Sequence, residues 1–265
     1  MTQQPPLKGN IKAIFLDIDG TLVSFQTHRI PQSTKDIISQ VRKLGVKIII
    51  ATGRPLPFVD NLEDLEYDGI MTVNGALCQT AQGTTIRQNP INHHDLTRLI
   101  DYCNTNPIAM AFTSAEEAYL NFATQELHDV FQLLNIKIPP QLPLSHCLDM
   151  DIMQLVMFFP PEKEQALMAH ILPHCTPHRW HPYFADVIAS GNSKQNGVDA
   201  FCQYFNIPLS QTLAFGDGGN DIGMLQHVGY GYAMGNSKPE VLKAAPYITD
   251  SVDNQGVAQI LQQLL

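Results

Sequence analysis

Residues 14–25 read IFLDIDGTLVSF, and this stretch decides how the rest of the sequence is interpreted. An apolar run typical of a buried strand ends in two aspartates, Asp17 and Asp19, which are followed by Gly-Thr. Side chains alternate along a strand, so both carboxylates are expected to point to the same side at its end. Burial and like-charge repulsion each disfavour two ionised carboxylates in such a place. We therefore expect a function that requires the pair.

The residues that follow predict a parallel sheet. A strand is expected over 11–16, a helix over 33–44 and a second strand over 46–50, where VKIII shows little alternation because both of its faces are buried. Ser33 is expected to cap the helix together with Asp36, and Gly45 to end it. Strand, helix and strand in this order form a βαβ unit, which predicts a doubly wound α/β fold.

The rest of the chain divides into two kinds of sequence. The C-terminal part continues the pattern of the N-terminal part, whereas residues 85–187 carry several proline-rich stretches and are expected to form an inserted second domain. Outside the insert we expect a short helix at 55–65, strands at 69–73, 212–216 and 230–234, and helices at 197–205, 221–228 and 238–245. Inside it we expect helices at 92–104 and 115–134 and a strand at 151–159.

Composition excludes several classes of protein. The chain has 265 residues, 44% of them hydrophobic, and a net charge of −9 from 16 basic and 25 acidic residues, which argues against a nucleic-acid partner. The five cysteines include no CxxC pair, so a reducing cytoplasm is expected. The N-terminal segment lacks the apolar core of a signal peptide, and no apolar run is long enough to span a membrane.

Four short polar clusters follow apolar strands or open a helix. Ligands of an open α/β sheet bind outside the carboxyl ends of its strands, so the clusters that follow strands are expected to share one crevice. Four carboxylates there call for a hard divalent cation, and the absence of His and Cys from the clusters favours Mg²⁺ over Zn²⁺. Glycine backbone amides, Thr52 and Lys194 suit a phosphate group. The clusters are 17–21 (DIDGT), 51–54 (ATGR), 193–194 (SK) and 216–221 (GDGGND).

In this order the clusters resemble the four motifs of the haloacid dehalogenase (HAD) superfamily. The insert between the second and third clusters is similar to the type IIB cap of the Cof-like sugar-phosphate phosphatases, as are NGA at 74–76 and RWHPYFADV at 179–187. One departure is Gln195, where the subfamily often has a glycine after the lysine. The resemblance implies a HAD core in residues 1–84 and 188–265 and an α/β cap in 85–187.

The resemblance also implies roles in catalysis. Asp17 is expected to be the nucleophile that forms an aspartyl-phosphate, and Asp19 to protonate the leaving alcohol and then activate water. Thr52, Gly53 and Lys194 are expected to bind the phosphate, where charge accumulates in the transition state. The implied activity is hydrolysis of a small phosphorylated molecule, with a hexose or pentose phosphate as the favoured substrate.

The same resemblance implies a magnesium site. Mg²⁺ is expected to bind Asp17, the backbone carbonyl of Asp19, and Asp217. Asn220 and Asp221 are expected to orient bound water in the second coordination shell.

Other functions fit the motifs less well. GDGGND lacks the third glycine of the dinucleotide-binding GxGxxG, and the chain contains no GxxxxGK[ST] motif of a P-loop kinase. Two alternatives stay open: a phosphomutase that returns the phosphoryl group to the sugar, and a phospho-ligand-binding protein of the same fold without turnover.

Several residues allow both a functional and a structural interpretation. Arg54 and Asn74 are expected to contact substrate, although Arg54 could pair with a core acid and Asn74 could shape a turn. Trp180 and Tyr183 could stack on a sugar ring, but cap core is the favoured interpretation. The histidines and the cysteine of HILPHCTPHRWH (170–181) are not expected to bind a metal, because two prolines prevent a helix from aligning them.

Overall fold

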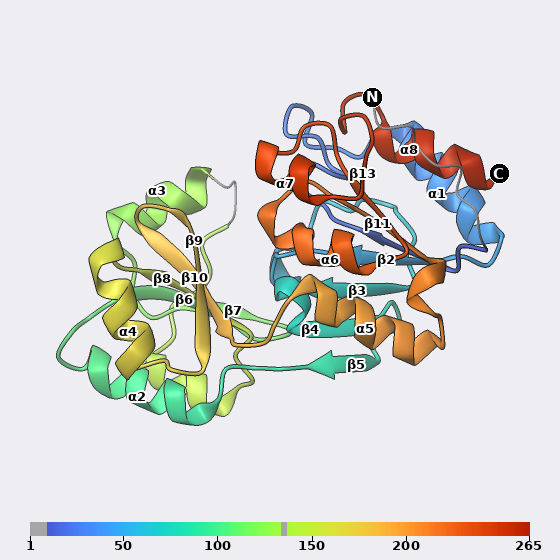
Figure 1. The fold of residues 1–265 in the computed structure, drawn as a ribbon. Helices are drawn as coiled ribbons and strands as arrows, with labels where there is room; N and C mark the ends of the chain where they lie inside the picture. Colours follow the sequence, from blue (N-terminus) through green and yellow to red (C-terminus); the bar gives the residue numbers. More distant parts are fainter. Residues whose placement is uncertain (1–9, 134–136) are drawn as a thin grey trace. The chain divides into compact units, whose positions relative to one another are not determined.

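The structure is a computed structural model, and it describes residues 10–133 and 137–265 (Figure 1). The chain divides into two compact units. The first comprises the described part of Met1–Arg54 together with Val59–Gln88 and Ser193–Leu265, and the second comprises Pro55–Phe58 and the described part of Asn89–Asn192. The sequence predicts an inserted domain over residues 85–187. Residues 1–9 of the predicted core lie outside the described part of the chain.

The first unit is built on an eight-stranded sheet. Its strands are β1 (Ala13–Leu16), β2 (Lys47–Ala51), β3 (Gly69–Thr72), β4 (Leu77–Thr80), β5 (Thr85–Gln88), β11 (Thr212–Gly216), β12 (Tyr230–Ala233) and β13 (Tyr247–Ile248). Their order is β13-β12-β11-β1-β2-β3-β4-β5; all neighbours from β13 to β3 are parallel, and β4 and β5 pair antiparallel. The chain leaves β1 towards β2 and leaves β11 in the opposite direction towards β12. The carboxyl ends of β1 and β11 therefore form the topological switch point of a doubly wound sheet.

Helices cover this sheet. They are α1 (Gln32–Lys43), α5 (Lys194–Phe205), α6 (Ile222–His227), α7 (Pro239–Ala244) and α8 (Gly256–Leu261). Phe15 and Ile49 pack with Phe201 of α5 and Met224 of α6 in one core. Because strand side chains alternate, the fully buried Ile14 points to the other face, and α1 and α8 lie side by side in contact with each other (Figure 1). Burial of both faces explains the unbroken apolar runs of β1, β2 and β11.

The second unit contains a five-stranded antiparallel sheet. Its elements are α2 (His93–Cys103), β6 (Ala109–Thr113), β7 (Ala118–Leu120), α3 (Gln125–Leu133), β8 (Gln154–Phe158), α4 (Glu164–His170), β9 (Cys175–His181) and β10 (Phe184–Ala189). The strand order is β7-β6-β8-β10-β9. Leu96 of α2 and Leu167 of α4 pack with Leu155 and Val187 on one face of the sheet. Leu127 of α3 packs with Val156 on the other face, so this unit has its own two-sided core.

Most predicted elements are present, with three corrections. Helix α1 begins at Gln32 after Pro31 and has no side-chain cap; the hydroxyl of Ser33 instead donates to Gln255 Oε1 at 2.8 Å. The helix predicted at 55–65 is only one short 3₁₀ turn, Leu56–Phe58, since Pro55 and Pro57 restrict it. The helix predicted at 115–134 is wrong up to residue 124, because β7 forms there and pairs with β6. Residue 134 lies outside the described part.

The histidine-rich run is divided between two elements: His170 ends helix α4, and Cys175–His181 forms strand β9. Among the residues with described positions, the group of three that could hold a metal consists of Asp17, Asp217 and Asp221. Trp180 and Tyr183, expected in the core of the insert, are instead 55% and 52% exposed, which is a correction. Within the described ranges no helix combines the length and apolarity needed to cross a membrane.

Candidate active site

The polar clusters lie at the carboxyl ends of neighbouring strands. Asp17 follows β1, Thr52 follows β2 and Asp217 follows β11, and these three strands are adjacent in the sheet. Lys194 is the first residue of α5, whose N-terminus is capped by the Ser193 side chain accepting the Asn196 backbone N–H. Parallel strands end at one edge, so the topology brings together residues that are up to 200 positions apart in the chain (17 to 217).

Lys194 forms the buried centre of the site. Its ammonium Nζ donates to Asp17 Oδ1 at 2.7 Å and to Asp221 Oδ1 at 2.5 Å, and its side chain is fully buried. Burial alone would lower the pKa of Lys194, but the two carboxylates outweigh it and raise the pKa above its ordinary value. Lys194 therefore lies between two carboxyl groups that favour its charged form.

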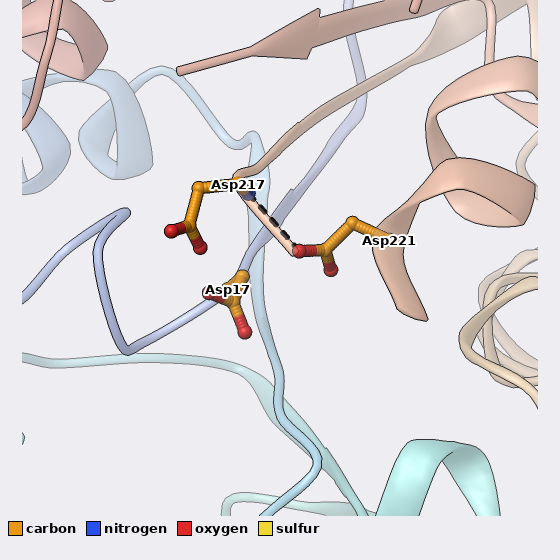
Figure 2. Close-up of side chains that lie close together, drawn as sticks. All are labelled: Asp17, Asp217 and Asp221. Atoms are coloured by element: carbon orange, nitrogen blue, oxygen red, sulfur yellow. Dashed lines mark hydrogen bonds between the residues drawn. The ribbon is translucent and has the colours of Figure 1, made fainter. Parts of the chain in front are cut away.

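Asp221 fixes the loop that follows β11. Its Oδ2 accepts the backbone N–H groups of Asp217 at 3.0 Å and Gly218 at 2.9 Å, while its Oδ1 accepts from Lys194. A Cβ on Gly216 would come within 2.4 Å of the Asp221 carboxyl carbon, so the glycine lets this carboxylate approach the strand end. Asp221 thereby sets the direction in which the Asp217 side chain leaves the strand (Figure 2).

Three carboxylates converge beside a single ammonium group. One oxygen each of Asp17, Asp217 and Asp221 lies within 4.8 Å of the others (Figure 2). Burial raises the pKa of Asp17 well above its ordinary value; Lys194 counteracts this, and the other two aspartates add to it. Burial and the nearby Asp221 also raise the pKa of Asp217 to about 6. An all-oxygen donor set with excess negative charge suits a hard divalent cation such as Mg²⁺, so these residues fit the predicted metal.

Asp19 has a different environment from Asp17. Its two oxygens accept from Arg54, at 2.7 Å from Nε and 2.8 Å from Nη2, and its side chain is 35% exposed. Arg54 is positioned by its own backbone N–H, which donates to Thr52 Oγ1 at 3.0 Å. Burial would lower the pKa of Arg54, but the hydrogen bonds and the charge of Asp19 raise it. The DIDGT motif thus presents one carboxylate to a lysine and the other to an arginine.

The turn after β3 packs against the turn after β2. The backbone N–H of Asn74 donates to Thr52 O at 3.1 Å, and Asn220 Nδ2 donates to Asn74 Oδ1 at 2.9 Å. Val73 and Asn74 both have positive φ, 49° and 52°, which is a strained conformation for a β-branched valine. A Cβ on Gly53 would lie 3.3 Å from Asn74 Oδ1, so Gly53 shares this corner. All ten predicted site residues thus belong to two neighbouring networks at one edge of the sheet.

Sequence reasoning missed Asn236, which follows β12. Its Nδ2 donates to Gly20 O at 2.9 Å and lies 3.4 Å from Asp217 Oδ2, and its Oδ1 accepts the Val252 backbone N–H at 3.0 Å. Asn236 therefore ties the DIDGT loop to the Asp217 side chain. The signal that could have found it was its position just beyond the predicted strand at 230–234, the same position that the other clusters hold.

Comparisons with known proteins agree with this geometry. A family model described as haloacid dehalogenase-like hydrolase matches residues 14–261. "Putative phosphatase YkrA" of Bacillus subtilis (strain 168) is 30% identical over 256 residues, covering 96% of this chain and 97% of that protein. The structure of the HAD subclass IIB sugar phosphatase BT4131 has a TM-score of 0.83 at 35% identity, covering 96% of this chain and 98% of that one. The structure of BT1666 of Bacteroides thetaiotaomicron, from a study of phosphatases of the haloalkanoate (HAD) superfamily, has a TM-score of 0.87 at 35% identity. This match covers 99% of this chain and 98% of that one.

The doubly wound core, the acidic residues at its switch point and these comparisons define a phosphatase. The chain belongs to the haloacid dehalogenase-like hydrolase family, and its structural relatives include a sugar phosphatase of HAD subclass IIB.

Proposed function

We propose that this phosphatase hydrolyses small sugar phosphates, with Mg²⁺ as cofactor and Asp17 as the nucleophile. The observation that carries the proposal is the group of three aspartates around Lys194. Their mutual repulsion makes the site unfavourable without a cation, and Lys194 provides only one of the positive charges that they require. A divalent cation would supply the two further positive charges that balance the three carboxylates.

The proposed first step is displacement at phosphorus. An oxygen of Asp17 attacks the phosphorus atom, the bond between phosphorus and the sugar oxygen breaks, and Asp19 gives its proton to the departing oxygen. In the second step Asp19 takes a proton from water, whose oxygen attacks phosphorus and releases inorganic phosphate from Asp17. Lys194 would stabilise the charge on the phosphoryl oxygens throughout, and Thr52 and Gly53 would donate to the same oxygens.

The metal ligands in this proposal are Asp17, the backbone carbonyl of Asp19, and Asp217. Asn220 and Asp221 would orient water at the metal, which agrees with the hydrogen bonds that tie them to Asn74 and to the loop after β11. When bound, Mg²⁺ neutralises negative charge on the phosphoryl group and allows the aspartates to remain ionised together.

The substrate class rests on the relatives and on the second unit. BT4131, a sugar phosphatase, is 35% identical to this chain over almost its whole length, and the second unit has the position in the sequence of a type IIB cap. We infer that the second unit selects the sugar, and that Arg54 and Asn74 contribute contacts to the substrate. The five cysteines, all described and all free thiols, support a reducing compartment such as the cytoplasm.

A phosphate-release assay tests the proposal. Purified protein with Mg²⁺ should release phosphate from at least one hexose or pentose phosphate, and Asp17→Asn should abolish turnover. Asp36→Asn, which removes one exposed carboxylate of helix α1, serves as the control and should keep full activity. Binding without release by the wild-type protein would favour the non-catalytic alternative, and transfer of the phosphoryl group back to the sugar would favour the mutase.

A further inference from the structure

The loop that follows β1 places an aromatic ring beside the carboxylate of Asp217. The ring belongs to Phe25, which is 63% exposed. Phe25 Cε2 lies 2.7 Å, and Asp217 Oδ2 lies 2.3 Å, from the position that a Cβ on Gly20 would occupy. The ring, the Gly20 backbone and the carboxylate therefore meet at one point. Because the ring fills space there, it limits how far this carboxylate can turn.

Phe25 is fixed by the residues on either side of it. Ser24 Oγ donates to Asp253 Oδ1 at 2.5 Å, and Gln26 Nε2 donates to Asp253 Oδ2 at 3.1 Å. Ser24 Oγ also accepts the backbone N–H groups of Gln26 at 3.0 Å and Thr27 at 3.3 Å. Both oxygens of one carboxylate thus hold this turn, and with it the backbone that carries Phe25.

Asn236 makes a second contact to the same part of the site. Its Nδ2 donates to Gly20 O at 2.9 Å and lies 3.4 Å from Asp217 Oδ2. Its Oδ1 accepts the backbone N–H of Val252 at 3.0 Å. Val252 directly precedes Asp253 in the chain. One dipeptide therefore supports both the amide and the aromatic ring that lie beside the Asp217 carboxylate.

The loop 250–256, which contains this dipeptide, is held by backbone hydrogen bonds. The N–H of Gly235, just beyond β12, donates to Asp250 O at 3.1 Å, and the N–H of Gly256 donates to Ser251 O at 3.0 Å. The aspartate at the centre of the loop is exposed. The loop thus offers a fixed support from which an exposed carboxylate reaches the turn that carries Phe25.

A metal ligand binds well only when its oxygen is held in place. Mg²⁺ requires near-octahedral geometry, and loss of a group that orients one of its ligands typically weakens binding by about 10–100-fold. Asp221 holds the backbone of Asp217, but the Asp217 side chain could still rotate about its own bonds. The contacts from Asn236 and Phe25 restrict that rotation.

We propose that Asp253 is a positioning residue for the metal site. Through Ser24 and Gln26 it holds Phe25 beside Asp217, and it thereby strengthens binding of Mg²⁺, although it lies outside the group of three aspartates. This role deepens the proposed function, on which it rests for Asp217 as a ligand of Mg²⁺, by naming a residue that sets the affinity for the metal.

Thermal melting at increasing concentrations of MgCl₂ measures binding of Mg²⁺ alone and needs no turnover. We expect the apparent Kd for Mg²⁺ to rise about tenfold in Asp253→Ala. Asp250→Ala is the matched control, because it removes another exposed carboxylate from the same loop and leaves the contacts of Asp253 intact. The control should keep the Kd within about twofold of the wild-type value.

Asp253→Asn separates hydrogen bonding from charge. Asparagine keeps an acceptor for Ser24 but loses the negative charge and the acceptor for Gln26. If the hydrogen bonds position the turn, the Kd of this variant should stay about threefold or less above that of the wild type. Equal losses in Asp253→Asn and Asp253→Ala would show that only the charge matters, and the positioning role would be wrong.

Phe25→Ala tests whether the effect of Asp253 passes through the aromatic ring. We expect a similar rise in Kd, and we expect the double variant to bind Mg²⁺ no more weakly than the weaker single variant, because both changes remove the same support. Losses that multiply in the double variant would contradict this link. Should Asp253→Ala fail to fold, Ser24→Ala, which keeps the carboxylate but removes its donor, must show the same rise in Kd.

The outcomes separate this role from the proposed function. If the wild type releases phosphate with Mg²⁺ but Asp253→Ala keeps the wild-type Kd, the positioning role fails and the proposed function stands. If the Kd rises as expected but the wild type hydrolyses no sugar phosphate, the catalytic proposal fails and the positioning role stands. If Mg²⁺ does not raise the melting temperature of the wild type, the assignment of Mg²⁺ and the positioning role both fail.

Discussion

Arg54 binds both carboxylate oxygens of Asp19, with N···O distances of 2.7 and 2.8 Å. The sequence leaves two roles open for this arginine, contact with substrate or pairing with an acid, and the structure shows that it orients the second aspartate of DIDGT. A two-point contact of this kind fixes the plane of the carboxylate as well as its position. Arg54 therefore controls how Asp19 is presented to any group at Asp17.

Replacing Arg54 tests this control. Arg54→Lys keeps the charge but cannot make the planar two-point contact, so we expect kcat for a sugar phosphate to fall about tenfold or more with a smaller change in KM. Steady-state kinetics separate the two constants. A rise in KM at constant kcat would show that Arg54 acts only by binding substrate.

Gly20 gives a prediction about the metal site. Its φ is +85°, and a Cβ would lie 2.3 Å from Asp217 Oδ2, so Gly20→Ala should displace the Asp217 carboxylate. We expect it to destabilise the protein by about 1–3 kcal/mol and to weaken Mg²⁺-dependent activity by about tenfold or more.

Gly83 is the matched control for this substitution. It has the same φ of +85°, and a Cβ added there would meet no atom within 4 Å, so Gly83→Ala introduces backbone strain without a steric clash. It should cost about 1–2 kcal/mol of stability and leave the Mg²⁺ dependence of activity unchanged. Equal effects of both substitutions on Mg²⁺ dependence would contradict the role given to Gly20.

Lys194 should be essential for stability as well as for activity. Lys194→Met leaves Asp17 and Asp221 buried without their cation, which should cost about 3–5 kcal/mol in urea unfolding without Mg²⁺. Lys43→Met, on the exposed end of helix α1, should change stability by no more than about 0.5 kcal/mol. A loss below about 1 kcal/mol in Lys194→Met would be inconsistent with a buried charge pair at this position.

Asp186 predicts a pH dependence of stability. Its pKa is raised from 3.8 to about 6 in the folded protein, so the folded state holds a proton that the unfolded chain releases, and stability falls as pH rises between these values. Asp186→Asn removes this effect. The stability of the variant relative to wild type should rise by about 2–3 kcal/mol from pH 4 to pH 7, measured by urea unfolding. His178, which faces Asp186 across the strands, is present in both proteins and largely cancels in the difference.

How much the sequence predicts depends on whether an interaction is local. Strands β1, β2 and β11 and the clusters that follow them are visible in the sequence because their apolar runs and motifs are contiguous. The helix predicted over 115–134 is wrong because β7 is stabilised by pairing with β6, which a local pattern does not report. The exposure of Trp180 and the hydrogen bonds from Arg54 to Asp19 likewise depend on tertiary contacts, which a local sequence pattern does not reveal.

The most direct test of Asp17 as the nucleophile, and of Asp17 and Asp217 as metal ligands, is a crystal structure of the protein with Mg²⁺ and beryllium fluoride, a mimic of a phosphoryl group. We expect the beryllium to be bonded to a carboxylate oxygen of Asp17 and in contact with Lys194, and one Mg²⁺ to be ligated by both Asp17 and Asp217 at about 2.1 Å. Beryllium fluoride on any other side chain, or Mg²⁺ bound away from these two aspartates, would contradict the proposed roles of Asp17 and Asp217.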